Sequence, residues 1–186
     1  CADVIIDFSH PNNLDDILAY AKKNKTKVVF ATTGFSKEQL DKIEEASKEI
    51  AIFQSYNTSF GIQMVTKILR QVAKEFYDNG YDIEILEKHH NQKVDAPSGT
   101  ALLLADSIKN SLDSETEYVY GRKGNKKREQ KEIGIHAVRG GGIIGDHEVI
   151  FAGTGEVIEF THKAISREVF AVGALKAAEY MAKITK

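Results

Sequence analysis

The stretch EKHHNQKVDAPSGTA, residues 87–101, gathers residue types that transfer protons and bind anions. His89, His90 and Lys93 precede a Pro-Ser-Gly-Thr run, and an apolar helical pattern follows. Three interpretations compete: a metal site, an ordinary solvated loop, and a pocket that holds an anion and moves a proton. Adjacent histidines point to opposite sides of an extended chain, and neither a His-Glu-x-x-His helix nor a cysteine cluster accompanies them. Metal binding is therefore disfavoured.

The helix start after the histidines favours the anion pocket. Asp95 or Ser98 can cap this helix, which leaves the amides of Gly99 and Thr100 at its positive end, where a carboxylate is stabilised. Lys93 adds a point charge and a proton donor. A histidine of ordinary pKa exchanges its proton close to neutral pH. A solvated loop explains the proline and the glycine but not the clustered titratable groups. The stretch therefore predicts acid-assisted chemistry on an anionic substrate.

The first 60 residues alternate buried strands with amphipathic helices. The apolar runs DVIIDF (3–8), KVVFAT (27–32) and IAIFQS (50–55) are spaced about 23–24 residues apart, as parallel strands with crossover helices are. Ser36 with Gln39 three residues later predicts a capping box at the second helix. This rhythm predicts an α/β fold containing part of a Rossmann-type, doubly wound parallel sheet.

The rest of the chain predicts an α+β domain. Helices are expected at 61–78, 98–112 and 166–182, and an alternating strand at 81–85. The strand-like segments 133–139, 147–153 and 156–162 follow one another, which predicts antiparallel pairing in a mixed or antiparallel sheet with helices on one face. The glycine-rich run RGGGIIG (139–145) lies between two of these strands, so we expect a flexible hairpin connection rather than a phosphate cradle.

Two loops of the first domain follow strand ends, where ligands bind in open α/β sheets. They are ATTG (31–34) and QSYNTSFG (54–61). Their hydroxyl and amide groups either meet a cofactor or serve as turn and capping residues. The G-x-G-x-x-G fingerprint of a complete dinucleotide domain is absent, together with its ribose reader. The chain is therefore expected to enter this fold midway.

Composition argues against several classes of protein. The formal net charge of −2 gives no bias toward nucleic acid or an anionic membrane. No apolar run approaches the ~20 residues that span a bilayer. Cys1 is the only cysteine, so no intrachain disulfide can form and a cytoplasmic setting is expected. The dense basic run at 122–131 lacks interleaved aromatic residues and is predicted to be a solvated loop.

Residues 87–101 resemble the motif E-x-H-H-x-x-K-x-D-x-P-S-G-T of the 4-hydroxy-tetrahydrodipicolinate reductase (dihydrodipicolinate reductase) family. The runs VIIDFSHP, ATTGF, NTSFG, IGIHAVRGGGIIGDHEVIFAG and FTHKAISREVFAVGA resemble its other blocks in the same order, over essentially the whole chain. The resemblance implies reduction of a cyclic dicarboxylate to tetrahydrodipicolinate in diaminopimelate and lysine biosynthesis. It also implies NADH or NADPH as cofactor and a homotetramer assembled through the sheet of the second domain.

Motif positions in this resemblance imply roles for single residues. His89 resembles the family's proton donor and acceptor, and Lys93 resembles its proton donor. The positions that resemble substrate contacts are His90, Ser98, Gly99 and Thr100. Those that resemble cofactor contacts are Phe8, Ala31, Thr32, Thr33, Ser55, Tyr56, Asn57, Thr58, Arg167 and Phe170.

Two positions depart from the family pattern. Ala31 stands where a glycine is usual, which predicts slight crowding of the cofactor, and Gln92 stands where some members carry a basic residue, which predicts weaker substrate attraction. We expect residues 1–58 to be the C-terminal part of the dinucleotide-binding domain and residues 59–166 to be the substrate-binding and oligomerisation domain. Residues 167–186 are expected to form a terminal helix that returns toward the first domain.

Two other hypotheses remain open from the sequence. An aldehyde dehydrogenase of similar two-domain build needs an internal cysteine nucleophile, for which the terminal Cys1 is a poor candidate. A truncated, catalytically inactive fragment of the same fold would retain the dicarboxylate pocket as a binding or assembly module. Binding of pyridine-2,6-dicarboxylate without binding of NADH would favour the inactive module.

Overall fold

The computed structural model describes residues 2–184, and these fold as two compact units. The first unit comprises Cys1–Phe60 and Glu168–Lys186, and the second comprises Gly61–Arg167. Cys1 and the last two residues of the expected terminal segment, 185 and 186, lie outside the described residues. Each unit has its own sheet and its own hydrophobic core.

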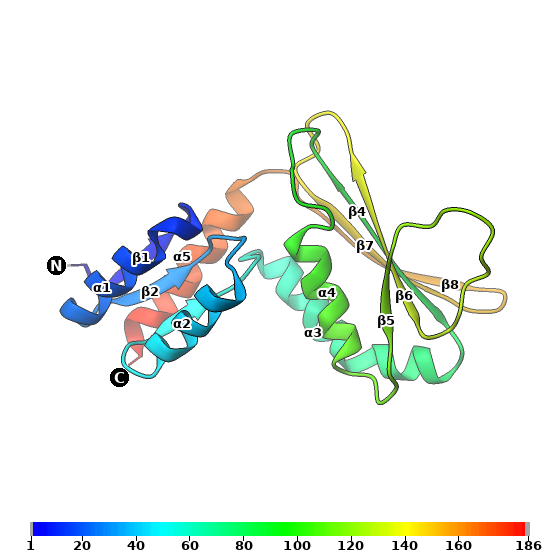
Figure 1. Ribbon diagram of the computed structural model, residues 1–186, viewed down its shortest axis with the longest axis horizontal. Coiled ribbons are helices and arrows are strands. Elements are labelled where there is room, and N and C mark those ends of the chain that lie inside the picture. Colours follow the sequence, from blue (N-terminus) through cyan, green and yellow to red (C-terminus); the bar gives the residue numbers. More distant parts are fainter. Residues whose placement is uncertain (1, 185–186) are drawn as a thin grey trace. The chain divides into compact units, whose positions relative to one another are not determined.

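The first unit is a parallel sheet between two helical layers (Figure 1). Its strands lie in the order β1-β2-β3, and both strand pairs are parallel. Leu14, Leu18 and Ala21 recur at helical spacing and pack the helix that begins at Leu14 onto one face. Ile43 and Ala46 bury the next helix in the same cluster, whereas Ala174 and Met181 of the last helix are buried with Val29 on the other face. The elements are β1 (Val4–Asp7), η1 (Pro11–Asn13), α1 (Leu14–Asn24), β2 (Lys27–Phe30), α2 (Lys37–Ser47), β3 (Ile52–Gln54) and α5 (Glu168–Lys183).

Local signals in the first unit act as the sequence predicted. Ser36 Oγ accepts from the Gln39 amide at 3.2 Å, and the Gln39 side chain accepts from the Ser36 amide at 3.0 Å, so the capping box is confirmed. The three strands of this parallel sheet are continuous apolar runs because helices cover both of its faces. This arrangement, together with the second unit, confirms the expected α/β fold class.

The second unit is a five-stranded mixed sheet of order β5-β6-β4-β7-β8. Strands β5, β6 and β4 run parallel to one another, while β4, β7 and β8 form antiparallel pairs. Its elements are α3 (Phe60–Asp78), β4 (Asp82–His89), α4 (Gly99–Lys109), β5 (Glu117–Tyr120), β6 (Glu132–Arg139), β7 (Asp146–Ala152) and β8 (Val157–Lys163).

Two expectations about this sheet are wrong. The strands at 133–139 and 147–153 do not pair with each other, because β4 lies between them and bonds to both. The glycine-rich run 139–145 is therefore a connection across β4 and not a hairpin turn. Only β7 and β8 form the expected antiparallel pair of consecutive strands. The sequence also missed β5, whose four residues show no alternation of buried and exposed positions.

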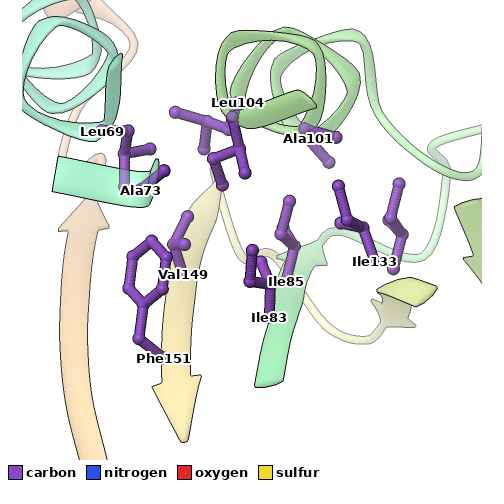
Figure 2. Packing of buried hydrophobic residues seen from close by; sticks show 12 residues of the cluster. Leu69, Ala73, Ile83, Ile85, Ala101, Leu104, Ile133, Val149 and Phe151 are labelled. Atoms are coloured by element: carbon purple, nitrogen blue, oxygen red, sulfur yellow. The ribbon is translucent and has the colours of Figure 1, made fainter. Parts of the chain in front are cut away.

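The core of the second unit lies between its sheet and the helices α3 and α4. Figure 2 shows side chains of both helices pointing toward those of three strands. Full burial of each large apolar side chain contributes roughly 1.5–3 kcal/mol, so this cluster is the main source of the unit's stability. The labelled residues are Leu69, Ala73, Ile83, Ile85, Ala101, Leu104, Ile133, Val149 and Phe151.

The basic run 122–131 is exposed at every position except Arg128, as expected of a solvated loop, but its two arginines form ion pairs with strand residues. Arg122 donates to Glu84 and Glu132, each at 2.7 Å. Arg128 donates to Glu84 at 2.9 Å and its side chain is only 16% exposed. A side chain at Gly134 would overlap the Glu84 carboxylate, which lies 1.8 Å from the ideal Cβ position. The loop is therefore tied to the outer face of the sheet.

Candidate active site

The 87–101 stretch spans the end of β4 and the start of α4. Alternation along β4 buries His89 and leaves His90, just past the strand end, half-buried. Ser98 is the N-cap of α4, in extended conformation, and its Oγ accepts from the Ala101 amide at 3.2 Å. Of the two caps that the sequence allowed, the structure selects Ser98 over Asp95. Gly99 and Thr100 occupy the first turn of the helix, as expected.

Glu87 is the centre of the polar cluster at this end of the sheet. Its side chain is fully buried, and four donors surround its two carboxylate oxygens. Oε2 accepts from His89 Nδ1 at 2.5 Å, and Oε1 accepts from the Ser98 amide at 3.0 Å. The Arg139 guanidinium donates to both oxygens, at 2.7 Å each. The bidentate geometry is the strong form of this ion pair.

These contacts fix the protonation state of Glu87. Burial acts to raise the pKa of its carboxyl, but hydrogen bonds from His89, Arg139 and the Ser98 amide outweigh burial and hold the pKa at about 2. Glu87 is therefore ionised at neutral pH and can only accept hydrogen bonds. Nδ1 of His89 must then carry a proton. The other ring nitrogen, Nε2, faces Gly145, where a Cβ would lie 3.1 Å from it.

His147 lies beside His89 and completes the cluster. The two rings meet edge to face with centroids 5.1 Å apart, and His147 Nε2 lies 3.2 Å from Ser98 Oγ. Burial, and after it the electrostatic influence of the His89 ring, lower the pKa of His147 to about 3. Its Nδ1 is buried without a hydrogen-bond partner. His147 is therefore a neutral, buried histidine that supports the start of α4.

Lys93 lies on the loop between β4 and α4. Its Nζ donates to Asp95 Oδ1 at 2.7 Å, and its side chain is 21% exposed. Arg139, besides holding Glu87, donates to the Asp95 carbonyl at 2.7 Å and so ties down this loop. The structure thus brings His89, Lys93 and the start of α4 to one end of the sheet in the second unit.

The first unit has a cavity of about 630 Å³ at the carboxyl ends of β1 and β2. Expected cofactor residues lie along it: Phe8, which is 50% exposed, and Ala31, Thr32 and Thr33. Asp7 organises this edge, because its carboxylate accepts from Thr32 Oγ1 and Ser9 Oγ at 2.6 Å each. Size, position and polar lining fit part of a dinucleotide. The remaining lining residues are Ser9, His10, Pro11, Asn12, Gly34 and Gln39.

The second expected cofactor loop, Ser55–Thr58, follows β3. Ser55 Oγ donates to the Asn57 carbonyl at 2.8 Å, so part of its polar surface serves the loop itself. Thr58 Oγ1 donates to the Phe170 carbonyl of α5 at 2.7 Å. The helix can approach this loop closely because Gly173 has no side chain. A Cβ at Gly173 would lie 1.8 Å from the Thr58 carbonyl oxygen. Tyr56 is half-buried in the same loop, and Arg167 is exposed just before α5.

Sequence reasoning missed Glu87, Arg139 and His147 as site residues. The signal for Glu87 was present, because it continues the buried alternation of Ile83 and Ile85 with a charged residue. Arg139 and His147 become neighbours of the site only through strand register: His89 pairs with Arg139, and Glu87 pairs with His147. Across the described residues 2–184, no three His, Cys, Asp or Glu side chains converge as metal ligands.

A parallel α/β unit with a cavity at its strand ends, joined to an α+β unit with a buried cluster of titratable side chains, has the build of a two-domain NAD(P)-dependent oxidoreductase. The model for the C-terminus of dihydrodipicolinate reductase matches residues 61–186, and the model for its N-terminus matches residues 1–58. The chain belongs to the dihydrodipicolinate reductase family.

Relatives agree with this assignment. The chain is 62% identical to 4-hydroxy-tetrahydrodipicolinate reductase of Clostridium novyi (strain NT), over 97% of this chain and 71% of that protein. It is 60% identical to the reductase of Clostridium botulinum (strain Eklund 17B / Type B), over 98% of this chain and 72% of that protein. Dipicolinate-bound dihydrodipicolinate reductase from Paenisporosarcina sp. TG-14 matches with a TM-score of 0.75 and 27% identity, over 99% of this chain and 70% of that one.

Proposed function

We propose that this protein is an NAD(P)H-dependent 4-hydroxy-tetrahydrodipicolinate reductase of diaminopimelate and lysine biosynthesis, in which His89 and Lys93 transfer the protons. The observation that carries the proposal is the intact polar cluster in a chain about 60% identical to reductases of that name. When bound, NADH or NADPH supplies the hydride. Overall, the substrate gains a hydride and a proton and loses water, which leaves tetrahydrodipicolinate and the oxidised cofactor.

The residues at the end of β4 suit the proton-transfer part of this reaction. The Nδ1 proton of His89 is held by Glu87, so Nε2 is the nitrogen that exchanges a proton with the substrate. Lys93 is a second donor on the adjacent loop, and an ammonium group there also attracts an anion. The paired Asp95 keeps Lys93 in place until a substrate carboxylate competes for it.

A dicarboxylate substrate has a matching binding surface. The amides of Gly99 and Thr100 lie in the first turn of α4, where the helix dipole favours negative charge. His90 is half-buried beside the same loop. A solved relative is described as dipicolinate-bound, and dipicolinate is a cyclic dicarboxylate. We therefore assign His90, Ser98, Gly99 and Thr100 to substrate binding, with Ser98 acting through its cap.

Substitution of the two proton-transfer residues tests these roles. In the full-length protein, Lys93→Met and His89→Gln should each lower kcat by about 10²- to 10⁴-fold, because each removes a positioned acid or base. Lys127→Met is the matched control, since Lys127 is an exposed lysine of the β5–β6 loop. Circular dichroism confirms that the variants fold. Turnover at the wild-type rate in both site variants would refute the role assignment.

Cofactor binding is tested separately by calorimetry with NADH and NADPH. The residues proposed to contact the cofactor are Phe8, Ala31–Thr33, Ser55–Thr58, Arg167 and Phe170. Thr32→Val removes the hydroxyl that bonds Asp7 and should weaken binding of either dinucleotide. Binding of pyridine-2,6-dicarboxylate with no binding of either dinucleotide would favour the inactive dicarboxylate-binding module instead.

The outer face of the second sheet is the proposed oligomer interface. Val138 and Val157, which alternation places on the face opposite α3 and α4, are 44% and 53% exposed. A homotetramer would bury such residues, and light scattering of the full-length protein should give four subunit masses. No helix within residues 2–184 combines the length and apolarity that crossing a membrane requires. We propose a cytoplasmic location, which cell fractionation tests.

A further inference from the structure

A fully buried carboxylate at the end of β4 calls for an explanation. Glu87 occupies a position where the strand's alternation otherwise places Ile83 and Ile85. Burial of a charge is costly, and an apolar side chain of similar volume at such a site is often at least as stabilising. All four of its hydrogen bonds come from the polar cluster, and one of them comes from the proposed proton-transfer residue His89. The charge therefore serves the site more directly than it serves the fold.

The carboxylate dictates which nitrogen of His89 carries the proton. An ionised carboxylate accepts hydrogen bonds and cannot donate them, so its partner Nδ1 must be the protonated nitrogen. In the opposite tautomer, Nδ1 and the carboxylate would place two lone pairs against each other at 2.5 Å. Only the Nδ1–H form leaves Nε2 with a lone pair for the substrate.

Arg139 keeps Glu87 in the required orientation. Its two terminal nitrogens bond both carboxylate oxygens, which fixes the plane of the carboxylate and hence the direction in which it faces His89. The same guanidinium bonds the Asp95 carbonyl on the loop that carries Lys93. One arginine thus connects the positions of both proposed proton-transfer residues.

We propose that Glu87, oriented by Arg139, is a positioning residue that holds His89 in the Nδ1–H tautomer and so makes Nε2 the atom that exchanges the proton with the substrate. The proposal rests on the role of His89 in the proposed function. Glu87 does not touch the reacting atoms. Its contribution lies in the fraction of His89 that is in the productive tautomer and ring orientation before each turnover.

Glu87→Gln separates this role from a structural one. The amide keeps the size of the side chain, but it replaces one acceptor oxygen by an NH2 group. That group meets either His89 Nδ1, where it favours the Nε2–H tautomer, or the donors of Arg139. We expect kcat to fall by about 10²- to 10⁴-fold, as when a carboxylate that orients a catalytic histidine is replaced by its amide. KM for the substrate should change by less than about threefold.

A spectroscopic measurement on the full-length protein tests the tautomer without activity. In ¹⁵N-labelled protein, the ring-nitrogen shifts of His89, identified by their loss in His89→Gln, should report Nδ1–H in the wild type and a shift toward Nε2–H in Glu87→Gln. Glu115→Gln is the control, because Glu115 is an exposed glutamate of the same unit. This control should retain wild-type kcat and the wild-type histidine shifts.

Several results would overturn the proposal. An Nε2–H tautomer of His89 in the wild-type protein contradicts it, whether or not Glu87→Gln folds. So does a folded Glu87→Gln variant that keeps the wild-type kcat. Failure of the proposed function would look different: His89→Gln would then turn over normally. Arg139→Lys, which keeps the charge but loses the fork, should lower kcat less than Glu87→Gln and should shift the His89 tautomer in the same direction.

Discussion

The buried His147 predicts how the stability of the protein depends on pH. Burial and the electrostatic influence of the neighbouring His89 hold the pKa of His147 at about 3, against 6.5 for an exposed histidine. Glu87 acts in the opposite direction, and the charges of His162 and Lys93 lower the pKa further. Between pH 6.5 and pH 3 the unfolded chain therefore binds a proton at this residue that the folded chain does not bind. The free energy of unfolding must fall as the pH falls through this window.

The size of the effect follows from linkage. One proton taken up only by the unfolded state costs about 1.4 kcal/mol per pH unit. From pH 6.5, where the unfolded residue is half protonated, down to 4.5, where the exposed form of Glu87 is half protonated, His147 alone should remove about 2 kcal/mol. A single domain is stable by only about 5–15 kcal/mol, so this is a large part of the total. Below that window Glu87 adds to the loss, because its folded pKa of about 2 lies under its unfolded value of 4.5.

His147→Gln isolates the contribution, because glutamine does not titrate. Urea unfolding of the wild type and the variant is measured at several pH values between 6.5 and 4.5, with fluorescence of the tyrosines as the probe. Every other group, including His162, whose pKa burial also lowers, is present in both proteins and cancels in the difference. The free energy of unfolding of the wild type should fall by about 2 kcal/mol more than that of the variant over this range. Parallel curves, offset by a constant, would refute a neutral, buried His147.

Two glycine substitutions, one in each unit, test places where a neighbouring residue packs directly against the glycine. Gly173→Ala places a methyl group 1.8 Å from the backbone carbonyl oxygen of Thr58. We therefore expect the free energy of unfolding to fall by more than about 3 kcal/mol and dinucleotide binding to weaken. A melting temperature equal to that of the wild type would contradict the close packing of α5. Gly134→Ala forces the Glu84 carboxylate out of its contacts with the arginines, and it should lower the free energy of unfolding by about 1–3 kcal/mol. Gly142→Ala is the control for both, because its Cβ meets no atom within 4 Å, and an equal loss in this variant would contradict the reasoning.

Local signals explain how much of the fold the sequence predicted. The strands of the first unit are continuous apolar runs, and its second helix begins at a capping box. Each of these elements can therefore be recognised from a few neighbouring residues. Helix α4 likewise begins directly after Ser98, whose hydroxyl caps it. These features depend on contacts between residues at most four apart, which a sequence displays directly.

Long-range pairing explains what the sequence could not predict. Strand β4 lies between β6 and β7, although it precedes both in the chain by more than 40 residues, and nothing local in 133–153 reveals this insertion. The same register brings Arg139 and His147 to His89 and Glu87. The motif thus supplied the groups proposed to react, whereas two of the residues that surround them come from strands whose partners only the fold determines.

The contacts of Glu87 also connect two parts of the site that the motif presents as separate. Its Oε2 receives the Nδ1 proton of His89, while its Oε1 receives the amide of Ser98, the cap of α4. A displacement of this carboxylate would therefore move both the residue proposed to transfer the proton and the helix start proposed to bind the substrate carboxylate. Because both groups bond the same rigidly held carboxylate, their separation is fixed before the substrate arrives. Such pre-organisation is what the proposed proton transfer to a bound dicarboxylate requires, since small errors in position are costly to the rate.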